Sequence, residues 1–435
     1  MAPIAITPPL NIEPTVSELT AQGIQHALSK SAPSHQKSHN GLVAKVAQLD
    51  ASLLTTALTT SPRSVPDMGS AEMASQKVCT DHMIQAQWSE ERGWEAPSLQ
   101  PYGPLSLMPT SSCLHYATQC FEGMKLYRGH DGKLRLFRPQ LNCKRMLMST
   151  TRIALPGFQP EELLKLIVKL CATDGPKWLP KDRPGAFLYI RPAMIGTDFA
   201  LGVQRPREAL LFVMLTCFAP MDDIPGGVKL LASQDDMCRA WPGGFGYAKV
   251  GANYGPSLVA QGEAREKGFH QILWLFGDDC VITEAGASNF FVVWRAKEDG
   301  RLQVVTADLN EKIVLDGVTR RSTLELLRTR LSSTSATAIR DGLEPVEVVE
   351  RKFTMLEIEE AHREGRLVEA FAAGTAWFIA PVGHIQFRGR DLQIDIGADG
   401  LGGQYTARVK TWLKNIMLGE GDGIGNEWGV VVDES

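Results

Sequence analysis

The sequence predicts an α/β (α+β) protein of two domains that follow an N-terminal extension. Three observations lead to this prediction. The chain has 435 residues, which is too many for one ordinary hydrophobic core. From about residue 75 onward, strand-like and helix-like segments alternate. A turn-rich stretch at 219–227 divides these segments into two sets, and we expect the domain boundary near residue 222.

Residues 1–70 form the predicted extension. They are rich in Ala, Ser, Thr and Pro, have weak hydrophobic periodicity and end in the turn-rich stretch 59–70. We expect this extension to be partly flexible, although the pattern at 40–58 could form a helix. The sequence assigns no function to the extension.

The first domain, residues 71–221, is expected to combine strands with a long helix. Residues 133–139 alternate apolar and polar side chains as a half-buried strand does, and the apolar runs 186–192 and 209–216 indicate buried strands. Residues 160–175 begin with a proline and two acidic residues and end at a glycine. Because their apolar side chains follow one stripe, they predict an amphipathic helix that ends at Gly175.

The second domain, residues 222–435, is expected to show the same alternation. Short apolar runs rich in β-branched and aromatic residues predict its strands, and longer segments that begin with a glycine predict its helices. The strands are expected at 228–233, 271–276, 290–294 and 302–307, and the helices at 255–268 and 317–331.

The composition is that of a soluble globular protein, with 44% hydrophobic and 22% charged residues and a net charge of -4. No basic excess indicates nucleic-acid binding. Apolar runs such as 209–215 are far shorter than the roughly 20 residues that span a bilayer, so we expect no membrane contact.

The eight cysteines are scattered, without a Cys-x-x-Cys pair or histidines at zinc spacing. This pattern favours a reducing compartment and predicts no metal site. The N-terminus matches neither a secretory signal nor an Arg-rich mitochondrial presequence. We therefore expect a cytoplasmic protein, with the mitochondrion as the alternative.

The stretch 243–258 holds five glycines and a single lysine, Lys249. A dinucleotide-binding loop is not expected, because Trp241-Pro242 precedes the glycines and no strand leads into them. Lys249 lies near Tyr247 and Tyr254, and a lysine in a partly dry, aromatic pocket becomes an amine nucleophile that can form a Schiff base. The alternative is an ordinary solvated loop lysine.

A lysine of this kind suggests pyridoxal phosphate, which needs a phosphate site and a carboxylate at its pyridine nitrogen. The run 312–327 passes through an Asp-Gly turn into a helix, whose first free N–H groups, at Val318 and Thr319, could bind phosphate. Glu284 lies in a small-residue turn between two apolar runs and could supply the carboxylate. Each feature alone also fits ordinary helix capping or an exposed turn acid.

Arg138 and Arg191 each end a predicted strand. Either arginine could bind an anion, and the alternatives are a surface position or a structural ion pair.

Seven segments in the same order make the chain resemble the branched-chain amino acid aminotransferases, and the fungal members in particular. Together they span roughly residues 75–430, and such an ordered set is far more specific than any single motif. The matching segments are 114–129, 134–146, 188–198, 239–261, 282–291, 315–322 and 369–382.

The resemblance implies fold type IV of the pyridoxal phosphate enzymes, with two α/β domains and the active site at their interface. It implies reversible transamination of leucine, isoleucine and valine with 2-oxoglutarate, by an obligate homodimer. Three alternatives stay open: an aminotransferase of the same fold in a specialised pathway, a D-amino acid transaminase or aminodeoxychorismate lyase, and a catalytically silent relative.

The resemblance also implies the residues of the cofactor site. Lys249 matches the Schiff-base lysine, Tyr254 the tyrosine at the phenolic oxygen of the cofactor, and Glu284 the carboxylate at its ring nitrogen. The residues that match the phosphate-binding set are Arg138, Val318, Thr319 and Thr375. The usual threonine after Glu-x-Gly is replaced by Ala287-Ser288, and this departure leaves the substrate range open.

The substrate-binding residues follow from the same resemblance. The turn Thr375-Ala376 matches the one that holds the α-carboxylate, and Tyr116 and Arg191 match residues that meet the distal carboxylate of glutamate. The side-chain pocket would be formed by Phe121, Tyr189 and Tyr254, and the loop that enters the site of the partner subunit would carry Leu201 and Val203.

Overall fold

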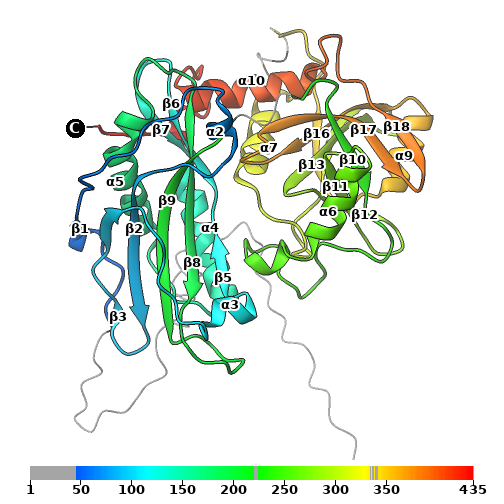
Figure 1. Cartoon of the computed structure of the whole chain (residues 1–435). Helices are drawn as coiled ribbons and strands as arrows, with labels where there is room; N and C mark the ends of the chain where they lie inside the picture. The colour runs from blue at the N-terminus through cyan, green and yellow to red at the C-terminus, as the bar shows by residue number, and fades with distance from the viewer. Residues whose placement is uncertain (1–45, 220–223, 334, 336–337, 339–340, 435) are drawn as a thin grey trace, which may run out of the picture.

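The computed structural model describes residues 46–219, 224–333, 335, 338 and 341–434. Two mixed sheets, each with its own helices, lie side by side, one of ten strands and one of nine (Figure 1). The first sheet is built mainly from residues before 218 and the second from residues after 227. The predicted α/β architecture in two parts is therefore confirmed.

The first sheet has the order β1-β4-β2-β9-β8-β6-β7-β19, with β3 paired to β2 and β5 to β8. Its centre is the antiparallel set β2, β9 and β8, which contains the predicted runs 186–192 and 209–216. The strands are β1 Thr55–Thr56, β2 Cys79–Ser89, β3 Gly93–Trp94, β4 Ser98–Pro101, β5 Gln119–Phe121, β6 Met124–Arg128, β7 Leu134–Phe137, β8 Phe187–Gly196, β9 Glu208–Cys217 and β19 Gly429–Val432.

The main helices of this part are α4, Pro139–Arg152, and α5, Pro160–Trp178, with the short helices α2, Ala71–Ala74, and α3, Ser112–Tyr116. The expected end of α5 at Gly175 is wrong, because the helix continues through Pro176 to Trp178. Gly175 serves helix packing instead: a Cβ there would lie 2.6 Å from Cδ1 of Leu134 in β7. The indole N–H of Trp178 donates to Asp81 and anchors the last turn.

The predicted helix at 40–58 is wrong for the residues that are described. Residues 51–53 form a 3-10 turn, η1, that starts at the side chain of Asp50, and β1 then pairs in parallel with β4. Leu49 is buried in the same apolar cluster as the first sheet, so tertiary contacts replace the helix. Residues 1–45 of the predicted extension lie outside the described part. The domain limits at residues 70 and 221 stay predictions.

The second sheet has the order β12-β11-β10-β17-β16-β13-β14-β15, with β18 paired to β17. All four strands predicted for this part are confirmed as β10, β11, β13 and β14. The strands are β10 Val228–Ala232, β11 Gln271–Phe276, β12 Val281–Ala285, β13 Ser288–Arg295, β14 Leu302–Thr306, β15 Glu347–Glu350, β16 Leu367–Ala373, β17 Ile379–Phe387 and β18 Arg390–Gln393.

The helices of this part include the two predicted ones, α6, Ser257–Glu266, and α7, Val318–Arg330, together with α9, Met355–Arg363. The remaining helix, α10, Gln404–Leu418, lies along the top of both parts in Figure 1 and contacts strands of both sheets. After α10 the chain returns to the first sheet, where β19 pairs antiparallel with β7. The polypeptide therefore crosses between the two sheets twice.

The N-terminus of α10 is held by a buried carboxylate. Glu369 in β16 accepts hydrogen bonds from the N–H groups of Tyr405, at 3.0 Å, and Thr406, at 2.8 Å, and from the Thr406 hydroxyl. The first N–H groups of a helix lack partners within the helix and carry partial positive charge. A carboxylate at this place satisfies them and fixes where α10 begins.

Glu369→Gln is expected to lower the free energy of unfolding by about 1–3 kcal/mol, because an amide offers one acceptor oxygen and no charge to these buried donors. Chemical denaturation followed by tryptophan fluorescence measures the change. The matched control, Glu298→Gln at an exposed position after β13, should alter it by less than about 0.5 kcal/mol. Equal effects of the two substitutions would contradict the capping role.

Candidate active site

Lys249 lies where the two sheets meet, and its backbone is held by the first part of the chain. Its carbonyl accepts the Phe121 N–H at 3.1 Å, and the neighbouring Val250 forms a β-bridge with Cys120 of β5. The Lys249 N–H donates to the Ser149 hydroxyl of α4 at 2.9 Å. The segment around Lys249 therefore extends β5, although it belongs to the second half of the chain.

The glycines near Lys249 allow backbones to approach closely. A Cβ on Gly246 would lie 2.6 Å from Cα of Ile313, and one on Gly251 would lie 2.5 Å from the side-chain nitrogen of Gln119. Real Cβ atoms do not tolerate such distances. These glycines let the lysine segment pack against both parts of the molecule.

The side chain of Lys249 is half-buried between aromatic rings. Its Nζ donates to the Tyr254 hydroxyl at 3.1 Å and lies 4.9 Å from the centroid of the Phe121 ring. The rings of Phe121 and Tyr254 are 5.1 Å apart. Tyr247, which we expected beside the lysine, instead contacts Lys312. The aromatic pocket predicted for Lys249 is formed by Phe121 and Tyr254.

Glu284 is not in a turn, as the sequence suggested, but in β12, where it is 2% exposed. Nε of Arg239 lies 3.1 Å from its carboxylate, and the Leu315 N–H donates to it at 2.7 Å. Burial raises the pKa of Glu284, and the charge of Arg239 and the Leu315 hydrogen bond oppose that rise. Arg239 was not identified from the sequence, although it begins one of the matching segments.

Three of the four predicted phosphate-binding residues line one pocket. Val318 and Thr319 start α7 after Gly317, and their N–H groups lie at the positive end of the helix. Thr375 lies in the bend between β16 and β17, and its hydroxyl donates to the Gly123 carbonyl at 3.3 Å. The lining residues of this pocket include Gly123, Asn142, Val318, Thr319, Gly374 and Thr375.

Arg138, the fourth residue of this set, caps α4 in a left-handed conformation with φ 46°. Its guanidinium makes two hydrogen bonds to Glu325, at 2.9 and 3.0 Å, and one to the Ser322 hydroxyl at 3.1 Å. It also lies 4.1 Å from the centroid of the Trp428 ring. Arg138 is thus fixed against α7, with its charge already paired.

The residues predicted to form the side-chain pocket include Phe121 and Tyr189, which contact Arg191. This arginine lies in the middle of β8 rather than at the end of a strand, since β8 continues to Gly196. Its guanidinium lies 4.5 Å from the Phe121 ring centroid and donates to the Tyr189 hydroxyl at 3.1 Å. Its Nε is buried and makes no hydrogen bond to the described residues. A buried N–H of this kind can donate a hydrogen bond to an oxygen atom of a ligand.

Tyr116 and the loop after β8 lie together at the edge of the site. The Tyr116 hydroxyl donates to the Leu201 carbonyl. Leu201 is 56% and Val203 88% exposed, and their predicted place in the site of a partner subunit stays a prediction.

Ala376 follows Thr375 in the bend between β16 and β17. Ser288 faces that bend, because a Cβ on Gly374 would lie 2.6 Å from its Oγ.

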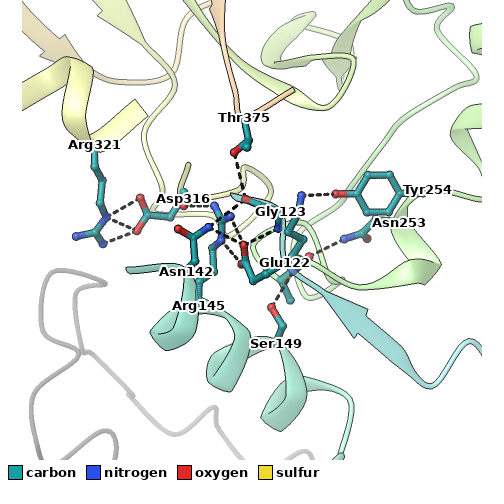
Figure 2. Close-up of polar contacts among 12 residues, drawn as sticks. Glu122, Gly123, Asn142, Arg145, Ser149, Asn253, Tyr254, Asp316, Arg321 and Thr375 are labelled. Carbon is teal, nitrogen blue, oxygen red and sulfur yellow. Dashed lines mark hydrogen bonds and ion pairs between the residues drawn. The ribbon is translucent and has the colours of Figure 1, made fainter. Parts of the chain in front are cut away.

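A buried ionic cluster next to Lys249 was missed by sequence reasoning. Figure 2 shows Glu122, which follows Phe121, meeting Arg145 and Asn142 of α4. Burial opposes ionisation of Glu122, but Arg145, with a smaller effect of Lys249, outweighs it and lowers the pKa of the carboxyl. The helical spacing of Asn142, Arg145 and Ser149 was the signal that could have revealed this polar face.

No helix in the described ranges is long and apolar enough to cross a membrane. Those same ranges contain no group of His, Cys, Asp and Glu side chains that could hold a metal ion. All eight cysteines are free, and six of them are buried.

Similarity to known proteins identifies the class of this protein, which is that of the aminotransferases. Residues 119–385, more than half of the chain, match the amino-transferase class IV family model. A branched-chain-amino-acid aminotransferase, mitochondrial, of Schizosaccharomyces pombe is 41% identical over 351 residues, which cover 81% of this chain and 78% of that protein. The cytosolic enzyme of Saccharomyces cerevisiae is 40% identical over 388 residues, covering 89% and 99%.

The chain therefore belongs to the branched-chain-amino-acid aminotransferase family and is an aminotransferase. The fold is shared with the branched-chain amino acid aminotransferase of Thermobaculum terrenum, solved in its PLP form, with a TM-score of 0.59 and 22% identity over 80% of this chain and 98% of that one. The names of the relatives favour the branched-chain interpretation over a D-amino acid transaminase or a silent relative.

Gly123→Ala is expected to lower kcat/KM about 10-fold or more, since an added methyl group in a tight pocket changes substrate discrimination by about 1–3 kcal/mol. A Cβ on Gly123 would lie 1.9 Å from the Tyr189 hydroxyl, so this wall of the pocket must move. Steady-state kinetics with leucine measure the loss. Gly103→Ala is the control, because a Cβ there would meet no atom within 4 Å. Unchanged kinetics of Gly123→Ala would show that Tyr189 does not shape the pocket.

Proposed function

We propose that this protein transfers the amino group of L-leucine, L-isoleucine or L-valine to 2-oxoglutarate with pyridoxal 5'-phosphate as cofactor. The products are the branched-chain 2-oxo acids and L-glutamate, and the reaction is reversible. The observation that carries the proposal is the position of the Lys249 amine, which is held by the Tyr254 hydroxyl at 3.1 Å where the two sheets meet.

The residues at this place fit the cofactor. The pocket at the start of α7 offers the N–H groups of Val318 and Thr319 to a phosphate, and Thr375 lines the same pocket. Arg138 is fixed against the same helix. The buried carboxylate of Glu284 can keep a ring nitrogen protonated. When bound, pyridoxal phosphate supplies an electron sink for the carbanion that forms at Cα of the amino acid.

The roles of the protein side chains follow from this placement. Lys249 would be the catalytic residue: its amine would hold the aldehyde of the cofactor and would move the proton at Cα of the substrate. The neighbouring Tyr254 orients the Lys249 amine through its hydroxyl. The packing of Phe121 against both side chains excludes water from one face of the amine.

The substrate pocket must accept an aliphatic chain in one half-reaction and a carboxylate in the other. Phe121, Tyr189 and Tyr254 offer apolar surface to leucine, isoleucine and valine. The buried Nε of Arg191 offers a donor to the distal carboxylate of glutamate. Tyr116, whose hydroxyl donates to the Leu201 carbonyl, would lie beside that carboxylate at the edge of the site. The bend at Thr375 and Ala376 lies where it can hold the α-carboxylate.

Two further parts of the proposal concern assembly and location. We place this enzyme in a homodimer, and the exposed apolar side chains of Leu201 and Val203 at the edge of the site support such a contact. We place it in the cytoplasm, where one of the yeast relatives also occurs, with the mitochondrion as the alternative.

A coupled assay over a panel of 2-oxo acids, with glutamate as amino donor, tests the proposed reaction. The 2-oxo acids of leucine, isoleucine and valine should give the highest kcat/KM, and L-leucine should bleach the visible absorbance of the purified protein. A preference for D-alanine would indicate a D-amino acid transaminase, and a preference for aminodeoxychorismate would indicate a lyase of the same fold. A preference for aromatic substrates would indicate an aminotransferase of a specialised pathway. A colourless protein that takes up no pyridoxal phosphate would overturn the proposal.

A further inference from the structure

One face of α4 carries polar side chains into the space between the two sheets. Asn142, Arg145 and Ser149 follow one another at spacings of three and four residues, so they lie along the same side of the helix. Figure 2 shows Asn142 and Arg145 meeting Glu122, and the Ser149 hydroxyl accepts the Lys249 N–H at 2.9 Å. The proposed function assigns no role to Arg145, the central member of this row.

The first contact of Arg145 is with Glu122, which is 0% exposed. Nε and Nη2 of the arginine donate to the two carboxylate oxygens at 2.6 and 2.8 Å. Asn142 and the Gly123 N–H complete the hydrogen bonds of the carboxylate, at 2.8 and 3.1 Å. A buried ion pair offsets its desolvation only when its hydrogen bonds are satisfied in this way. The pair therefore fixes the backbone at residue 122.

The residues on either side of Glu122 are walls of the site. The Phe121 ring lies against the Lys249 amine, and the Phe121 N–H binds the lysine carbonyl. On the other side, Gly123 packs under the Tyr189 hydroxyl and accepts a hydrogen bond from Thr375. A shift of Glu122 would consequently move the surroundings of Lys249 on both sides.

The remaining nitrogen of the same guanidinium reaches the second part of the molecule. Nη1 of Arg145 donates to the Asp316 carbonyl at 2.8 Å. Asp316 directly precedes the turn into α7, and its carboxylate is paired with Arg321. One planar group thus holds the wall beside Lys249 and the backbone that leads to the N–H groups of Val318 and Thr319.

We propose that Arg145 is a positioning residue that couples the wall at Lys249 to the phosphate-binding turn at the start of α7. The inference rests on the proposed function. A lysine at this position would keep the positive charge, but its single ammonium group cannot span Glu122 and Asp316 as the forked guanidinium does. We therefore predict that lysine cannot replace arginine at position 145 without loss of this coupling.

The test compares Arg145→Lys with the wild-type holoenzyme and with the control Lys144→Met. The control removes a positive charge one residue away on the same helix. The measured quantities are the dissociation constant of pyridoxal phosphate, from absorbance titration, and the pH at which the visible band of the bound cofactor changes. Circular dichroism checks the fold of each variant.

Arg145→Lys is expected to bind pyridoxal phosphate about 10–100-fold more weakly, because hydrogen bonds from a charged donor contribute about 1.5–3 kcal/mol. The pH of the spectral change should also move, while Lys144→Met keeps both values within about twofold. A folded Arg145→Lys protein with the wild-type dissociation constant and pH profile would overturn the inference.

A second variant keeps the test decisive if Arg145→Lys does not fold. Asn142→Ala removes the hydrogen bonds of the amide to Glu122 and to the Gly123 carbonyl and leaves the ion pair, so it should weaken cofactor binding in the same direction by a smaller factor. Wild-type binding by folded Asn142→Ala would then count against the inference. Failure of the wild-type protein to bind pyridoxal phosphate would refute the proposed function instead, so the two failures are distinguishable.

Discussion

Lys249→Ala is expected to lower kcat by about 10³-fold or more, near the upper end of what a positioned acid-base group contributes, because the same amine also forms the covalent link to the cofactor. The variant should also lose the visible absorbance that depends on that link. The fold should survive, since the backbone contacts of Lys249 with Phe121 and Ser149 do not involve its side chain. Single-turnover kinetics with L-leucine and an absorption spectrum measure both effects.

Lys267→Ala provides the matched control for this experiment. Lys267 lies at the exposed end of α6, in the same part of the chain, and its loss should leave both rate and spectrum unchanged. A Lys249→Ala protein that kept the absorbance and the rate would contradict the assignment of Lys249 as the catalytic residue.

Glu284→Gln is expected to reduce kcat by about 10²–10³-fold, the range seen when one preorganised electrostatic partner is removed. The amide cannot carry the negative charge that stabilises a protonated ring nitrogen. It also leaves the buried Arg239 without its ionic partner, which costs about 3–5 kcal/mol of stability in comparable cases. Steady-state kinetics and chemical denaturation measure the two effects separately.

A double variant separates the catalytic role of Glu284 from its structural one. Removing both members of a buried ion pair is less costly than removing one, so Glu284→Gln with Arg239→Gln should recover stability relative to Glu284→Gln. Activity should not recover, because the carboxylate is still absent. Parallel recovery of rate and stability would mean that Glu284 acts only through folding.

The elements with strong local patterns could be predicted from the sequence. The alternation at 133–139 and the apolar runs at 209–216 and 271–276 indicate strands, and β7, β9 and β11 lie there. The half-buried strand expected at 133–139 is wrong in one respect, because all four residues of β7 are buried, including Arg135, whose charge is paired with Asp131. Lys249 and Tyr254 were predicted together, since they lie five residues apart and the short turn η2, Gly251–Asn253, brings their side chains together.

The contacts that were missed join residues far apart in the chain. Nothing in the spacing of Arg239 and Glu284 shows that the arginine reaches under β12, because their contact depends on how β12 packs in the second sheet. Glu122 and Arg145 meet only after β5 and α4 have packed together. The predicted end of α5 at Gly175 was wrong for the same reason, because the neighbour of Gly175, Leu134, is distant in sequence. In the sequence, a glycine that is needed for close packing cannot be distinguished from one that ends a helix.

The return of the chain to the first sheet limits how the molecule can open. The C-terminal strand β19 pairs antiparallel with β7, and the buried Arg128 donates hydrogen bonds of 2.5 and 3.0 Å to the Glu434 carboxylate. Moving the two sheets apart would strain this pairing of the C-terminal segment with the first sheet. We therefore expect amino acids to enter and 2-oxo acids to leave through movements of short surface loops. The two sheets on either side of Lys249 should keep their relative position.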